Sequence, residues 1–178
     1  MSVSGFVEQD SVTVVFGERF ARSAQFDTIF REGMSLVEQT AEYLDGAGRA
    51  DAKKLKPPAS VVYATESMRL TTRLLDLASW LLVQRSLKEG EITEEEALAK
   101  RDGVKLRPFG RPSHIKHFEA LPQGLQSLIK RSFSLSDRIT QLDLALRANE
   151  EEVVAAARNP VNEQMRQLQA AFDGPKES

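Results

Sequence analysis

The sequence predicts an all-α protein, an antiparallel three-helix bundle with a short connector helix and flexible termini. Apolar residues recur at helical spacing in three long segments, and stretches containing Gly and Pro separate these segments. After residue 16, no segment alternates apolar and polar residues as a half-buried strand would. The 178 residues fit one domain. We expect an N-terminal tail at 1–15, the bundle at 16–147, and a flexible C-terminal tail with a short amphipathic segment at 148–178.

The first helix is predicted over residues 18–44, because its apolar residues fall on two adjacent stripes. One stripe has i, i+3, i+4, i+7 spacing and the other repeats every seven residues, so together they cover about half of a helix at about 100° per residue. The stripes consist of Phe26, Phe30, Gly33, Val37, Ala41 and Leu44, and of Ile29, Leu36 and Tyr43. Gly46 and Gly48 end the helix, and Pro57–Pro58 keep the linker extended.

The second helix is predicted over residues 59–89, with Gly90 as its stop signal. On a helical wheel, one half holds Met68, Leu70, Leu74, Leu75, Leu77, Ala78, Leu81 and Leu82, and the other holds Arg69, Thr72, Arg73, Asp76, Trp80, Val83 and Gln84. This apolar arc is wider than the stripe of roughly 100° that a surface helix needs. Two explanations stay open: contact with two neighbours inside the bundle, or a self-complementary surface buried in a homodimer.

Signals for a connector helix and a third long helix follow. Thr93 is placed to be an N-cap with Glu96 as its capping-box partner, which predicts a short solvent-facing connector helix. The third helix begins near Leu121–Pro122 and has a heptad seam in which only Ser132 is polar. The seam consists of Leu121, Leu128, Leu135 and Leu142 and of Leu125, Ser132, Ile139 and Leu146. Beyond Arg147 the pattern weakens, so the helix either extends or frays.

Composition and the absence of known motifs argue against several classes of function. The net charge of −2 lacks the basic excess typical of nucleic-acid binders, and the absence of cysteine excludes disulfides and thiolate chemistry. The sequence contains no nucleotide-binding loop and no nucleophile-elbow motif, and His114 and His117 alone do not make a metal site. We therefore expect no enzyme activity, no cofactor and no metal. With neither a signal peptide nor a membrane span, we expect a cytoplasmic protein.

Two surfaces are candidate binding sites. On the second helix, Arg69, Arg73, Asp76 and Trp80 share one face, which is either a Trp stabilised by local Arg contact or a recognition patch for a protein partner. The segment 100–117 is basic and suggests an alternative function, a nucleic-acid-associated helical bundle. Its charged residues are Lys100, Arg101, Lys105, Arg107, Arg111 and Lys116, with Phe109 among them. The acidic run before this segment opposes that alternative.

Two strings carry a family resemblance. "FREGMSLVEQTAEYLDG" and "ATESMRLTTRLLDLASWLL" resemble the RcdA family, the alphaproteobacterial regulators of CtrA degradation. The resemblance is dense over residues 16–101 and is carried mainly by leucine spacing in the third helix.

The resemblance implies a three-helix homodimer without catalytic activity. It also implies an adaptor that delivers cell-cycle regulators of the CtrA type to the ClpXP protease together with co-adaptors, and recruitment to a cell pole through such partners. A tail used in interactions is a further implication. Here the tail would offer the amphipathic face of Met165, Leu168 and Phe172 to a partner groove.

Overall fold

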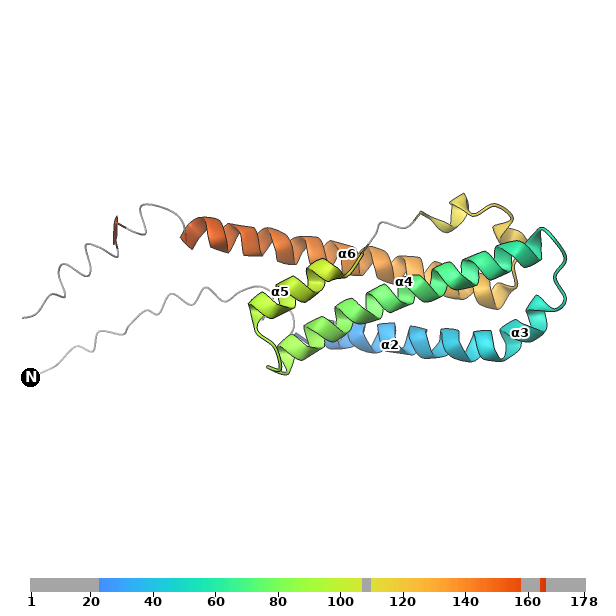
Figure 1. The fold of residues 1–178 in the computed structure, drawn as a ribbon, viewed down its shortest axis with the longest axis horizontal. Coiled ribbons are helices and arrows are strands. Elements are labelled where there is room, and N and C mark those ends of the chain that lie inside the picture. Colours follow the sequence, from blue (N-terminus) through green and yellow to red (C-terminus); the bar gives the residue numbers. More distant parts are fainter. Residues whose placement is uncertain (1–22, 107–109, 158–163, 166–178) are drawn as a thin grey trace, which may run out of the picture.

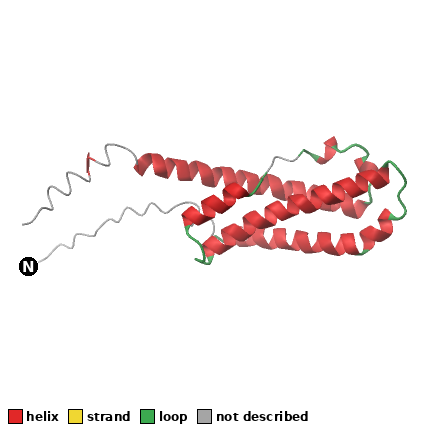
Figure 2. Ribbon diagram, in the orientation of Figure 1, coloured by secondary structure: helices red, strands yellow, loops and turns green. Residues whose placement is uncertain are grey.

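The computed structural model describes residues 23–106, 110–157 and 164–165, and within them the regular structure is entirely helical (Figures 1 and 2). The helices are α2 (Ala24–Asp45), α3 (Ala47–Ala52), α4 (Ala59–Lys88), α5 (Glu94–Gly103) and α6 (Gln123–Ala157). Two 3-10 turns, Pro112–His114 and Phe118–Ala120, lie between α5 and α6. The predicted all-α bundle class is confirmed, and α3 occupies the start of the expected linker.

Side-chain caps fix where two helices begin. The Ser23 Oγ accepts a hydrogen bond from the Phe26 backbone N–H at 3.2 Å, which starts α2. The capping box predicted for α5 is present. The Thr93 Oγ1 accepts from the Glu96 N–H at 3.2 Å, and the Glu96 carboxylate accepts from the Thr93 N–H at 2.8 Å.

The three long helices do not simply alternate in direction. Helix α2 runs opposite to α6, as the contact between Gln39 and Arg131 at 2.7 Å and the ion pair between Glu32 and Arg138 show. Helices α4 and α6 run in the same direction, because Arg73 contacts Ser132 and Trp80 contacts Asp143, while α5 leads back along the bundle (Figure 1). The bundle is therefore antiparallel between α2 and the other two long helices, and its parallel pair is α4 and α6.

The core lies along the axis where α2, α4 and α6 meet. The heptad seam of α6 forms one wall of it, because seven of its eight residues are buried and Leu142 is half-buried. From α2 and α4 the core takes Phe26, Ile29, Leu36, Leu70, Leu74, Leu77, Trp80 and Leu81. Helix α6 continues to Ala157 and projects past the neighbouring ends of α2 and α4 (Figure 1).

We predict that Gly33→Ala destabilises the bundle. A Cβ at Gly33 would overlap the Leu81 Cδ1, and Leu81 is fully buried, so the neighbouring side chains would have to shift. Overpacking of this kind costs about 1–3 kcal/mol, measurable as a lower free energy of unfolding in urea. Gly103→Ala is the matched control, because an added Cβ there meets no atom within 4 Å. Equal stability of the two variants would contradict the close α2–α4 packing.

Candidate functional site

Helix α4 buries part of each half of its predicted wheel: four leucines of the apolar half lie in the core as expected, together with Arg73 and Trp80 of the polar half. Trp80 is 0% exposed and Arg73 is 2% exposed, so the expectation that these two side chains form an outward face is wrong. Arg69 is exposed and Asp76 is half-buried. The four residues proposed as a partner-binding patch therefore do not lie on one accessible surface. A direct role of Arg69 or Asp76 in partner binding remains a prediction.

Contacts from α6 make the burial of Arg73 possible. The Arg73 Nη1 donates a hydrogen bond to the Ser132 Oγ at 2.6 Å, and its guanidinium lies 3.8 Å from the centroid of the Phe133 ring. Burial lowers the pKa of Arg73 to about 10, so the side chain is still protonated at neutral pH. Ser132, the polar residue in the α6 heptad seam, is thus the acceptor for a charged residue of α4.

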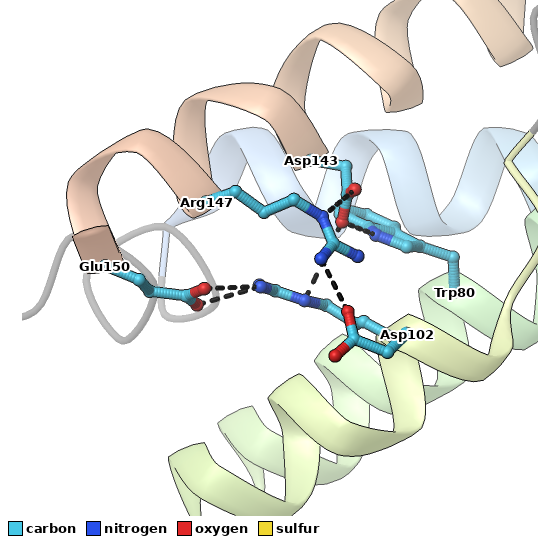
Figure 3. Close-up of polar contacts among 6 residues, drawn as sticks. Trp80, Asp102, Asp143, Arg147 and Glu150 are labelled. Atoms are coloured by element: carbon cyan, nitrogen blue, oxygen red, sulfur yellow. Dashed lines mark hydrogen bonds and ion pairs between the residues drawn. The ribbon is translucent and has the colours of Figure 1, made fainter.

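Trp80 is anchored by a carboxylate on α6. The Trp80 Nε1 donates to the Asp143 Oδ1 at 2.8 Å (Figure 3). The second oxygen of Asp143 accepts from the Arg147 Nε at 2.7 Å, and the Arg101 Nε lies 3.7 Å from Oδ1. A buried indole N–H normally requires a partner, and Asp143 supplies it.

The same cluster attaches α5 to the bundle. Arg101, 2% exposed, makes a two-oxygen contact with Glu150 at 2.8 and 2.9 Å. Arg147 donates to Asp102 at 2.5 Å (Figure 3). Hydrogen bonds to Asp143 and then to Asp102 raise the pKa of Arg147. Because α5 buries Arg101 against α6, it is not the solvent-facing connector that its charge pattern predicted. We call Trp80, Arg101, Asp102, Asp143, Arg147 and Glu150 the Asp143 network.

The outward face of α4 carries a regular row of large apolar side chains. Val61, Met68, Leu75 and Leu82 lie seven residues apart and are 63%, 73%, 66% and 52% exposed. We call these four residues the α4 apolar stripe. A seven-residue repeat keeps side chains on one side of a helix, so the stripe is a continuous line along the surface. The spacing was visible in the sequence, but nothing in it indicated that this side of α4 faces outward.

A groove borders the α4 apolar stripe on the side of α2. It has a volume of about 330 Å³ and lies between α2 and α4. Its lining is mostly apolar or small: Val37, Thr40, Ala41, Leu44, Asp45, Thr71, Leu74, Leu75 and Ala78. Leu75 belongs to both the stripe and the groove, so the two features form one surface.

The structure describes only part of the other two predicted sites, the basic segment 100–117 and the C-terminal tail. In the basic segment 100–117, Arg101 is held by Glu150 and is not accessible to a phosphate backbone, while residues 107–109, including Arg107 and Phe109, lie outside the described part. In the tail, Met165 is exposed, and Leu168 and Phe172 lie outside the described residues.

The described ranges contain no cluster of three or more His, Asp or Glu side chains that would hold a metal ion. Of the helices in those ranges, none has the length and hydropathy needed to cross a membrane.

Fold and surface together define an α-helical bundle with an exposed apolar helix face. Residues 17–172 match the family described as "Protein of unknown function (DUF1465)". Among solved structures, the chain is similar to RcdA from Caulobacter crescentus CB15, with 50% identity and a TM-score of 0.60, covering 72% of this chain and 96% of that one. The chain belongs to the RcdA family, which confirms the resemblance. A comparison with curated proteins gives no match.

We predict that Asp143→Ala strongly destabilises the protein. The change would leave the Trp80 N–H without its acceptor and remove a carboxylate from between Arg101 and Arg147. Breaking a buried ionic contact by removing one partner costs about 3–5 kcal/mol, to be measured by denaturant unfolding. Asp137→Ala, an exposed site on the same helix, is the matched control and should stay within about 0.5 kcal/mol of wild type. A similar small effect for Asp143→Ala would show that the network does not hold α4.

Proposed function

We propose that this protein is a non-enzymatic adaptor in regulated proteolysis. It binds regulatory proteins of the CtrA type and presents them to a ClpXP protease in the cytoplasm. Tethering both partners raises the effective concentration of the substrate at the protease, and no bond is made or broken by the adaptor. Membership of the RcdA family supports the class of function. The observation that carries a binding role is the α4 apolar stripe, since a line of exposed large apolar side chains marks an interaction surface.

We further propose that the α4 apolar stripe is the seam of a homodimer. Two α4 helices packed antiparallel about a twofold axis between Thr71 and Thr72 would bring unlike members of the stripe together. Val61 would meet the partner's Leu82, and Met68 would meet the partner's Leu75, in both halves of the interface. A surface that complements itself under a twofold axis is what an isologous dimer requires.

Charge and side-chain size agree with this pairing. Arg69 and Asp76 flank the stripe on the same side and are seven residues apart. In the antiparallel arrangement Arg69 would lie near the partner's Asp76, so opposite charges face each other twice across the seam. Thr65, Thr72 and Ser79 lie beside the stripe and are small; the two threonines are exposed and Ser79 is half-buried. Small side chains at a contact let two helix axes approach closely.

We expect Leu75→Glu to convert the homodimer to a monomer, because it places a charge from each copy in the apolar centre of the seam. Light scattering at micromolar concentration should give half of the wild-type mass. Leu144→Glu is the matched control: Leu144 is 61% exposed but lies on α6. Its mass should remain that of the dimer. A monomeric wild-type protein, or a dimeric Leu75→Glu variant with native circular dichroism, would refute the α4 seam.

The adaptor role predicts that adding this protein with its co-adaptors accelerates degradation of a CtrA-type regulator by ClpXP. The measurement is the rate of substrate loss in a reconstituted reaction with and without the protein. Unchanged degradation of every regulator that co-purifies with the protein would rule out delivery. The dimer experiment is independent of this outcome, because it needs neither protease nor substrate.

A further inference from the structure

A second hollow lies on the α6 side of α4, away from the α4 apolar stripe. It has a volume of about 220 Å³ and is enclosed by α4, by the segment around the 3-10 turn Pro112–His114, and by α6. Its functional groups are Glu66, Arg69, Arg73, Arg111, His114 and Phe133. The adaptor role makes no use of this hollow, and the homodimer seam involves only one of its lining residues, Arg69.

Positive charge dominates the lining of this hollow. Three arginines line it, with Glu66 as the single carboxylate among the lining residues. Glu66 is only 3% exposed, and its Oε1 accepts a hydrogen bond from the Arg69 Nη1 at 2.7 Å. Three positive charges and one negative charge leave a formal excess of two positive charges among the lining residues.

Arg73 and Arg111 approach the hollow from different elements. The Arg73 guanidinium is held by Ser132 and the Phe133 ring, so it is fixed in position and largely removed from water. Arg111 is exposed at the other wall. Its backbone N–H donates to the His114 Nδ1 at 3.4 Å, which places the imidazole beside it. A buried and an exposed guanidinium from two different elements thus line one hollow, which suits a small oxyanion.

We propose that this hollow binds a phosphate group, either of inorganic phosphate or of a phosphate monoester. A phosphate carries about −1.5 to −2 charge at neutral pH, which matches the excess of two positive charges better than a carboxylate does. Guanidinium groups form paired hydrogen bonds with phosphate oxygens, and the apolar walls of Phe133 and Ile115 keep the interaction partly shielded from water. The ligand is free inorganic phosphate or a small phosphorylated compound, and the test separates the two.

The experiment titrates the full-length protein with inorganic phosphate, O-phospho-L-serine and AMP at constant ionic strength, with acetate as the monoanionic comparison. Binding is measured by calorimetry, and its location by two-dimensional NMR of backbone amides. We expect saturable binding of phosphate compounds, with the largest shifts at Gly110, Arg111 and His114. If both esters bind less tightly than inorganic phosphate, the ligand is free phosphate. If either ester binds more tightly, it is a phosphorylated compound.

Arg111→Gln should weaken phosphate binding about tenfold or more, because it removes a charged hydrogen-bond donor from the clamp. The residue is exposed, and circular dichroism should confirm an unchanged fold. Arg31→Gln on α2 is the matched control, since it removes the same charge outside the hollow and should leave affinity unchanged. The proposal is overturned if acetate binds as tightly as phosphate, if Arg111→Gln binds like wild type, or if the amide shifts lie elsewhere.

Discussion

Asp143 on α6 sets the rotation of α4 in the bundle. Its carboxylate accepts a hydrogen bond from the indole of Trp80 and interacts with Arg147 and Arg101. A carboxylate so little exposed is acceptable only when its oxygens are occupied, and here three side chains from three helices occupy them. Two turns before Trp80, Arg73 donates a hydrogen bond to Ser132 on the same helix, α6. With these contacts in place, the Trp/Arg side of α4 must face inward.

The exposed apolar stripe follows from that rotation. Because the side of α4 that carries Arg73, Trp80 and Gln84 is buried, the opposite side with Met68, Leu75 and Leu82 is left toward solvent. Burying polar groups while exposing leucines is unfavourable for a protein that functions alone, and it becomes reasonable when another surface covers the leucines. The same contacts bring Arg73 to the hollow that Arg69 and Arg111 also line, where we propose that phosphate binds. The proposed dimer seam and the proposed phosphate site thus depend on one choice of helix orientation.

The sequence predicted features that depend on local spacing. The α6 seam, the bounds of α4 within a residue or two, and the Thr93–Glu96 capping box are all confirmed, since each is determined by residues within a few positions of one another. The family was also identified correctly from two strings in the first two long helices.

The orientation of α4 was not predictable in this way. The buried face takes residues from both arcs of the wheel, and the atoms that bring Arg73 and Trp80 into it lie 59 and 63 residues away in Ser132 and Asp143. Ser132 was visible as a polar interruption of an apolar seam, but its partner was not. The parallel course of α4 and α6 depends likewise on the return path through α5, whose docking relies on the long-range contact between Arg101 and Glu150.

The most direct test of this account is the accessibility of Trp80, the single tryptophan of the chain. Acrylamide quenching of its fluorescence should be measured in the wild type and in Leu75→Glu, so that shielding by the bundle is separated from shielding by a second copy. Burial against Asp143 predicts weak quenching and blue-shifted emission in both proteins. Quenching as efficient as that of free indole, in either native protein, would contradict the inward orientation of Trp80 and with it the origin of the exposed stripe.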